Sequence, residues 1–361
     1  MGDMNRMLEF SICPVDHAGR YPVLYSLYLW SSTNMEISNV FSLSAHEIDW
    51  RKNGLRYFSY SYYLKQKFGH RVQRVSVDAG FTCPNVDGTV ALGGCTFCDN
   101  RSFSPSRRLP RKNDISDQID DGISRVKRRY KCKHFMAYFQ PATNTYAPVE
   151  TLRELYETAI AHPEVVALAI GTRPDCVPND VLDLLEEIAG KIPLTVEYGM
   201  QTMHDKSLDW MNRGHHHDAM LDAMERSTDR GFEICGHIML GLPGESREDM
   251  LETAHEVTRI ELDAVKIHNL YCVEKTPLAD QVRSGEVKLM ERDEYISILV
   301  DFLEIIPPTT IVERISGEAP GDFFVGPKWC LDKPDVLNAV REEFERRDTW
   351  QGKAFESAAA N

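Results

Sequence analysis

The chain has 361 residues, of which 42% are hydrophobic and 27% charged, and its formal net charge is −14. This composition is typical of globular proteins and excludes wholesale disorder and fibrous repeats, while the acidic balance excludes a protein that coats nucleic acid without selectivity. The most apolar segment, residues 21–30, is too short for a membrane span, which needs about 20 apolar residues.

Residues 1–45 keep neither helical nor strand periodicity and contain several residues typical of turns. We expect a poorly ordered N-terminal extension there, with Met35 as an alternative start. The same region has no clear export signal. Nine cysteines, an odd number, in a chain without such a signal indicate metal or redox use of thiols in a reducing cytoplasm rather than a disulfide framework.

From Tyr57 onward, β-rich apolar runs alternate with helix-period segments. The expected strands are Arg74–Asp78, His134–Gln140, Val165–Ile170, Leu194–Tyr198, Ile234–Leu240 and Ala264–His268. The helices between them are expected at 115–130, 149–162, 177–189, 218–230 and 247–260. This order predicts an α/β fold, a partial parallel (β/α) barrel of six βα units over residues 57–305, with its working residues at the C-terminal strand ends.

After His268 the rhythm changes. A helix is expected at 293–305, followed by Pro307-Pro308, a strand at 309–315 and a helix at 334–346. We interpret residues 306–352 as a small C-terminal α+β extension and residues 353–361 as a tail.

Positive charge is concentrated between Arg101 and Lys133, where eleven Lys and Arg stand against four Asp, a local net charge of +7. Such a stripe on an acidic chain indicates a local anionic partner. Interleaved aromatic residues make nucleic-acid contact a hypothesis, and a solvated helix face is the alternative.

The strongest chemical signal is a loop after the first expected strand that carries Cys83, Cys95 and Cys98. Two residues separate Cys95 from Cys98, a spacing that lets two thiolates reach one metal centre. Thiolates select zinc or an iron–sulfur cluster. Structural zinc needs four ligands, so three cysteines favour a cluster with one open iron. The alternatives are a zinc loop completed by Cys132 or His134, or three buried thiols.

With these motifs in order, the chain resembles the radical S-adenosylmethionine (SAM) superfamily, specifically the YhcC/YtqA-like family related to the Elongator catalytic subunit. The resemblance covers roughly Tyr57 to Gly352 and includes the wide gap between the first two cysteines. It also rests on these segments: Tyr138–Pro141, Thr143–Tyr146, Gly171–Asp175, Glu197–Thr202, Asn212–His215, His237–Glu245, Lys266–His268 and Thr276–Ala279.

The resemblance implies a [4Fe-4S] cluster held by the three cysteines and SAM as cosubstrate. It implies that Phe97 and Gln140 contact the cofactor, Gln140 through a carbonyl that accepts from the methionyl ammonium. Glu197 and Arg173 are further cofactor-binding candidates. Glu197 is expected to accept hydrogen bonds from the ribose hydroxyls, and a salt-bridged barrel residue is the alternative. Arg173 is expected to pair with the cofactor carboxylate or with a substrate phosphate, and Asp175 to orient it.

His237 and His268 lie on or at the ends of different expected strands and are the candidates for a catalytic donor or acid; satisfied barrel histidines are the alternative. The run His215–His217 is expected to be a solvated N-terminal helix turn rather than a metal site, because neighbouring side chains there diverge.

We therefore expect a cytoplasmic radical SAM enzyme that forms a 5′-deoxyadenosyl radical and modifies transfer RNA, at carbon 5 of the wobble uridine. Its expected partners are a reductase or a flavodoxin- or ferredoxin-type electron donor, and transfer RNA through residues 101–133. A radical SAM enzyme acting on a protein or small metabolite, and a non-catalytic iron–sulfur or zinc module, are the alternatives.

Overall fold

The computed structural model describes residues 45–102, 104–105 and 114–359. The expected N-terminal extension lies outside the described residues except for Ala45, which opens a short 3-10 helix, Ala45–Glu47. Eight residues of the basic stripe, 106–113, also lie outside them.

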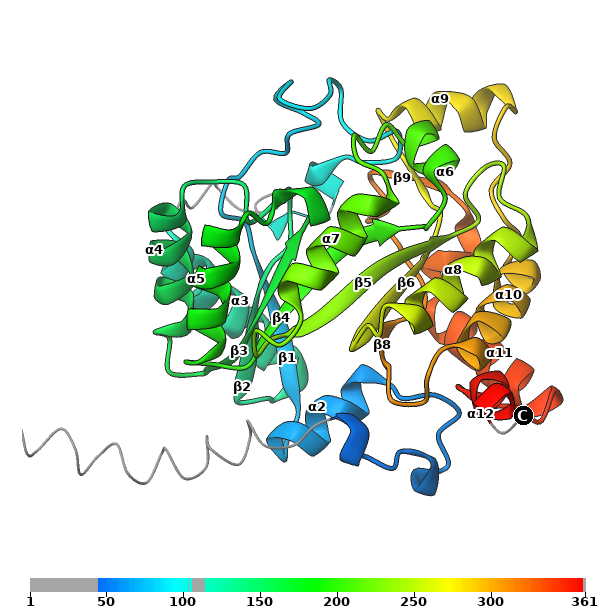
Figure 1. The fold of residues 1–361 in the computed structure, drawn as a ribbon, viewed down its shortest axis with the longest axis horizontal. Helices are drawn as coiled ribbons and strands as arrows, with labels where there is room; N and C mark the ends of the chain where they lie inside the picture. The colour runs from blue at the N-terminus through cyan, green and yellow to red at the C-terminus, as the bar shows by residue number, and fades with distance from the viewer. Residues whose placement is uncertain (1–44, 103, 106–113, 360–361) are drawn as a thin grey trace, which may run out of the picture. The chain divides into compact units, whose positions relative to one another are not determined.

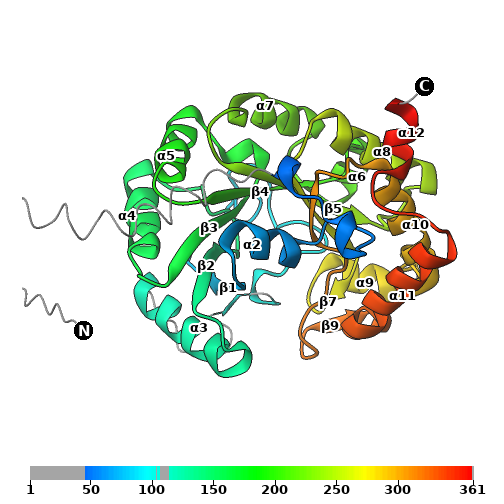
Figure 2. The same ribbon diagram turned by 90° about the horizontal axis from the view of Figure 1, so that it is seen from below.

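Seven parallel strands form one curled sheet in the order β1-β2-β3-β4-β5-β6-β8, and the helices cover its outer face (Figures 1 and 2). The strands are β1 (Val72–Val77), β2 (His134–Phe139), β3 (Val165–Thr172), β4 (Leu194–Gln201), β5 (Glu233–Leu240), β6 (Ala264–Asn269) and β8 (Ile311–Arg314). The six expected strands are confirmed to within a few residues, as is the partial parallel barrel.

The seventh strand corrects the expected count of six βα units. Strand β8, which we expected within a C-terminal extension, pairs in parallel with β6. Its Ile311 and Val312 are buried and continue the apolar surface of the sheet. Helix α10 (Arg292–Ile305) makes the crossover from β6 to β8. The chain after residue 305 therefore contributes a strand to the barrel instead of forming a region apart from it.

Six helices pack on the outer face of the sheet, and two of them begin at polar residues that cap them. The six are α3 (Ile115–Tyr130), α4 (Val149–Ile160), α5 (Asn179–Ala189), α7 (His217–Ser227), α8 (Arg247–Arg259) and α10. The Asp114 carboxylate accepts hydrogen bonds from two amides at the start of α3. Ser246 and Asp249 form a reciprocal capping box at the start of α8.

Several further elements were not expected. They are α2 (Tyr60–Phe68), α6 (Asp205–Trp210), α9 (Pro277–Ser284), and the two-stranded sheet of β7 (Cys272–Val273) and β9 (Phe324–Gly326). The expected helix at 334–346 is α11 (Lys333–Arg346). The expected tail is corrected too, because residues 353–359 form helix α12 (Lys353–Ala359), which contacts α10.

Helix α2 lies across the N-terminal ends of the strands, where Figure 2 shows it over the centre of the ring. It contacts both edge strands, β1 and β8. Just before it, the Val312 amide donates a hydrogen bond to the Phe58 carbonyl (2.8 Å). An open sheet edge exposes unpaired backbone groups, so this segment covers the seam of the partial barrel. No helix in the described part of the chain is long and apolar enough to cross a membrane.

Close packing of α3 on β1 generates a prediction. A Cβ placed on Gly122 would lie 2.2 Å from Cγ1 of Val75. We expect Gly122→Val to lower the free energy of unfolding by about 1–3 kcal/mol through overpacking, measured by urea denaturation. Gly321→Val, at an exposed position with no atom near its Cβ, is the control and should stay within about 0.5 kcal/mol. A Gly122→Val protein as stable as the control would contradict this packing.

Candidate functional site

The C-terminal ends of the strands border a cavity of about 1090 Å³. This is the size of a site for a small-molecule ligand or cofactor. Its walls include all nine candidate residues from the sequence: Cys83, Cys95, Phe97, Cys98, Gln140, Arg173, Glu197, His237 and His268. The topology thus brings together side chains that are spread over most of the barrel sequence.

The three cysteines lie on the loop that follows β1. Cys95 is buried, and Cys83 and Cys98 are half-buried. The Cys98 amide donates to the Cys95 carbonyl (2.9 Å), a tight turn that holds these two residues together. All eight cysteines in the described ranges are free thiols.

Asn85 holds the cysteine loop in place, and the sequence analysis missed it. Its side chain is completely buried. The Nδ2 group donates to the carbonyls of Asn212 (2.6 Å) and Arg213 (2.8 Å) and lies 3.5 Å from the Cys95 sulfur. Asn85 therefore ties the loop to the segment after α6. The sequence signal for this role was a side-chain amide two residues after Cys83. The two carbonyls that it binds, however, belong to residues more than 100 positions later in the chain.

Two buried arginines lie beside the thiols. Arg173 Nη1 is 4.0 Å from the Cys83 sulfur, and Arg213 Nη1 is 3.6 Å from the Cys95 sulfur. The Asp175 carboxylate accepts from Nε and Nη2 of Arg173 at 2.8 and 2.7 Å. This leaves Nη1 pointing at the thiol, so Asp175 orients Arg173 as expected. Buried positive charge stabilises thiolates and the anionic centres that they form.

The thiols also repel one another when ionised. Burial raises the pKa of Cys98, and negative charge on Cys95 and Cys83 raises it further. Three thiolates in this space therefore need a cation among them. The zinc alternative is not supported, because Cys132 and His134 lie at the start of β2, at the other end of the barrel from the cavity. The donor set fits a soft-metal cluster held by three thiolates.

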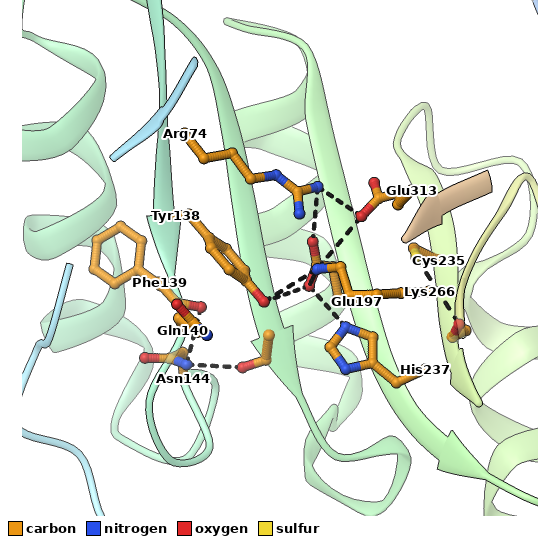
Figure 3. Close-up of polar contacts among 12 residues, drawn as sticks. Arg74, Tyr138, Phe139, Gln140, Asn144, Glu197, Cys235, His237, Lys266 and Glu313 are labelled. Carbon is orange, nitrogen blue, oxygen red and sulfur yellow. Dashed lines mark hydrogen bonds and ion pairs between the residues drawn. The ribbon is translucent and has the colours of Figure 1, made fainter. Parts of the chain in front are cut away.

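Deeper in the barrel, a buried ion-pair network surrounds Glu197 on β4 (Figure 3). Glu197 Oε2 accepts from Lys266 Nζ (2.5 Å), His237 Nε2 (2.8 Å) and the Tyr138 hydroxyl (2.6 Å). Arg74 Nη2 lies 3.1 Å from Glu197 Oε1.

Glu313 completes the network from β8. It pairs with Arg74 at 2.6 Å and with Lys266 at 3.3 Å. Two cations thus face two carboxylates, all from different strands. Sequence analysis singled out Glu197 and His237 but missed Arg74, Lys266 and Glu313. The signal was a charged residue in the middle of an apolar strand, most clearly Lys266.

The charges fix the protonation of the network. Burial alone would raise the pKa of Glu197, but Lys266 and Arg74 hold it well below its ordinary value. Burial and Lys266 lower the pKa of His237, so its imidazole is neutral near pH 7. Glu197 thus makes the salt bridges of the alternative interpretation, and it also lines the cavity, so its expected ribose contact stays a prediction.

Gln140 and Phe97 border the cavity with other contacts of their own. The side-chain oxygen of Gln140, Oε1, accepts a hydrogen bond from the Ser76 hydroxyl (3.0 Å). Phe97 packs on a buried apolar cluster around Leu208 and Leu278. Their expected cofactor contacts remain predictions.

The histidines separate into two groups. The rings of His237 and His268 are 5.6 Å apart on neighbouring strands of the cavity. His216 and His217 diverge, since His216 binds Asp209 (2.9 Å) and His217 binds Glu256 (2.5 Å). The side chains of the run therefore diverge at the start of α7, as expected, but only His216 is exposed, and His215 and His217 are half-buried.

The described residues of the basic stripe do not form one surface. Arg101 borders the cavity, where it pairs with Asp99. Helix α3 then runs back along the sheet to the start of β2, so its basic residues lie at the opposite end of the barrel. There Arg71 and Arg129 flank the exposed Tyr130 ring, at 4.7 and 5.1 Å from its centroid.

The chain is similar to known proteins over most of its length. The chain matches the Radical SAM superfamily over residues 91–257 and the Radical_SAM C-terminal domain over residues 262–346. The uncharacterized protein YtqA of Bacillus subtilis is 41% identical over 83% of this chain and 93% of its own length. A tRNA uridine(34) acetyltransferase of Methanocaldococcus jannaschii is 30% identical over 49% of this chain and 32% of its own.

Among solved structures, Elp3 of Methanocaldococcus infernus with an N-terminal deletion superposes with a TM-score of 0.61. The match covers 78% of this chain and 64% of that chain at 20% identity. This is a similarity of fold alone.

The ion-pair network predicts a large effect of one substitution. Lys266→Met would leave Glu197 buried without its 2.5 Å partner. We expect the free energy of unfolding at pH 7 to fall by about 3–5 kcal/mol, measured by urea denaturation. Lys127→Met removes an exposed ion pair with Glu164 and should cost no more than about 1 kcal/mol.

The same variant has a pH signature. In the wild type the depressed pKa of Glu197 means that its stabilisation is complete above the unfolded value, near 4.5, and is lost as pH falls through the folded pKa. In Lys266→Met the pKa of Glu197 rises, so this acid-side loss should move to higher pH. Equal stability losses in the Lys266 and Lys127 variants would contradict the network.

Proposed function

The chain belongs to the radical SAM superfamily, whose members bind a [4Fe-4S] cluster and SAM, and on this premise we propose that it is a radical SAM enzyme with its reaction centre in the cavity. When bound, the cluster supplies the electron that cleaves the sulfonium C–S bond of SAM to give a 5′-deoxyadenosyl radical. The observation that carries the proposal is the convergence of Cys83, Cys95 and Cys98 on one cavity beside two buried arginines.

In this proposal each part of the cavity has one task. The three thiolates hold three irons, and Arg173 and Arg213 offset the negative charge of that centre. Gln140 and Phe97, from β2 and the cysteine loop, contact SAM. The neutral His237 and His268 are candidates for a donor or acid at the substrate. A low-potential donor of the flavodoxin, ferredoxin or reductase type supplies the electron, in a cytoplasm that keeps thiols reduced.

For the substrate we propose transfer RNA, at the carbon-5 side chain of the wobble uridine. The support is the relative named a tRNA uridine(34) acetyltransferase, together with the exposed basic end of α3. The matched part covers 32% of that relative, so its acetyl transfer is not carried over. Remodelling of a side chain already present on the uridine is the reaction that we favour.

Cluster binding is tested by anaerobic reconstitution of the full chain. Wild-type protein should take up about four iron atoms per chain and release 5′-deoxyadenosine when reduced in the presence of SAM. Cys83→Ala, Cys95→Ala and Cys98→Ala should each lose the cluster absorbance and the deoxyadenosine. Cys132→Ala, a buried thiol remote from the cavity, is the matched control and should retain both. Tight zinc binding without SAM cleavage would support the non-catalytic module instead.

The substrate is tested in cells that lack the gene. Nucleoside mass spectrometry of their transfer RNA should show an altered wobble uridine, and an unchanged profile removes transfer RNA as the substrate. In vitro, Arg128→Gln with Arg129→Gln should weaken binding of bulk transfer RNA and reduce the slope of log K against log salt by about 2. Arg153→Gln, which removes a surface arginine paired with Glu187, should leave that slope unchanged.

A further inference from the structure

A bulge in β8 turns two neighbouring charged side chains toward the cavity. Val312 pairs with Val265 and Arg314 pairs with Lys266, which leaves Glu313 as an extra residue without a partner on β6. Successive side chains of a regular strand point to opposite faces, and a bulge interrupts this alternation. Both Glu313 and Arg314 line the cavity.

Glu313 makes two ion pairs inside the protein through Oε2, while its Oε1 atom is buried without a hydrogen-bond partner among the described residues. Its partners are Arg74 and Lys266, and the same two cations hold Glu197. Two positive and two negative charges therefore balance in the floor of the cavity. No carboxylate of this network pairs with Arg314.

The other cavity arginines also have partners. Arg173 pairs with Asp175 and Arg101 with Asp99. Arg213 donates to the Gly199 carbonyl and lies beside the Cys95 sulfur. These partners account for the remaining guanidinium groups in the wall.

Arg314 is different. Within the described ranges its guanidinium forms no hydrogen bond and no ion pair, although the residue is only half-exposed at the end of β8. Lys275, at the exposed rim of the cavity, also forms no ion pair within the described ranges, but it is solvated. A partly buried cation without a counter-ion is costly to keep, and a planar guanidinium binds carboxylate or phosphate through two parallel hydrogen bonds.

His268 supplies a second unsatisfied group beside it. It lies two residues after Lys266 on β6, on the same face of the strand. Its Nε2 atom is buried and has no hydrogen-bond partner among the described residues. A Cβ on Gly317 would lie 2.9 Å from the other ring nitrogen, Nδ1, so the chain at residue 317 covers that edge of the ring.

The charge state of His268 suits an anion. Burial and the nearby Arg314 hold the pKa of His268 well below its ordinary value. The ring is therefore neutral near pH 7, and its N–H donates a hydrogen bond without repelling Arg314. The planar guanidinium of Arg314 and the neutral N–H of His268 together form a site for a single anionic group.

We propose that Arg314 and His268 form a subsite for an anionic group of the substrate, a carboxylate or a phosphate. The inference rests on the proposed function, because it assigns the anion to the substrate that enters this cavity. In the sheet order β8 lies four strands from β3, which precedes the cofactor candidate Arg173. The subsite thus anchors the substrate at strands other than the one that leads to Arg173.

The test is protection of Arg314 from an arginine reagent. Anaerobically reconstituted full-chain protein is treated with phenylglyoxal, alone or with acetate, inorganic phosphate or SAM, and modified peptides are quantified by mass spectrometry. Saturating acetate or phosphate should slow the modification of Arg314 about fivefold or more, and the anion that protects at lower concentration identifies the group. The exposed Arg125 of α3 is the internal control and should be modified at the same rate throughout.

A variant adds a second measure. His268→Leu, which has no donor, should raise the anion concentration for half-protection of Arg314 about three- to tenfold, the effect of losing one hydrogen bond. Equal rates with and without both anions overturn the subsite. If SAM, added without acetate or phosphate, protects Arg314 as well as these anions do, Arg314 belongs to the cosubstrate site, and this result also overturns the subsite. Release of 5′-deoxyadenosine from the same sample tests the proposed function separately, because anion protection does not need SAM cleavage.

Discussion

The ion pair between Arg74 and Glu313 closes an open sheet. Arg74 belongs to β1 and Glu313 to β8, the two edges of a seven-stranded partial barrel. No backbone ladder joins these edges in the described part of the chain, so side chains and helix α2 have to do so. Lys266 and Glu197 extend the pair to β6 and β4, which makes the curvature of the sheet depend on buried electrostatics.

This closure also explains the shape of the site. Most (β/α) barrels fill their interior with layers of branched apolar side chains. Here the layer below the cavity is polar and nearly electroneutral, and each charge in it is matched by another. The interior can therefore stay hydrogen-bonded beside an open cavity, while the cysteine loop, which Asn85 anchors, forms the wall above it.

Periodicity predicted most of this architecture, because each βα unit is built from local patterns. The six strands and the outer helices follow from apolar spacing and from caps such as Asp114 and Ser246. The three cysteines follow from spacing and ligand chemistry. The strand at 309–315 was predicted, but its place in the barrel was not, because its pairing with β6 is a tertiary contact that the local pattern does not contain. Arg74, Lys266 and Glu313 were missed because charge balance between distant strands is invisible along the chain.

The course of α3 separates two parts of the protein that lie close together in sequence. Its basic end emerges where β2 begins, whereas the cavity opens where β2 ends, and the six residues of that strand span about 20 Å. A polynucleotide that feeds one base into the cavity must therefore wrap around the flank of the barrel to reach Arg128 and Arg129. Affinity and turnover would then depend on different stretches of the RNA: a short hairpin would satisfy the chemistry, and only a longer molecule would gain the full electrostatic attraction.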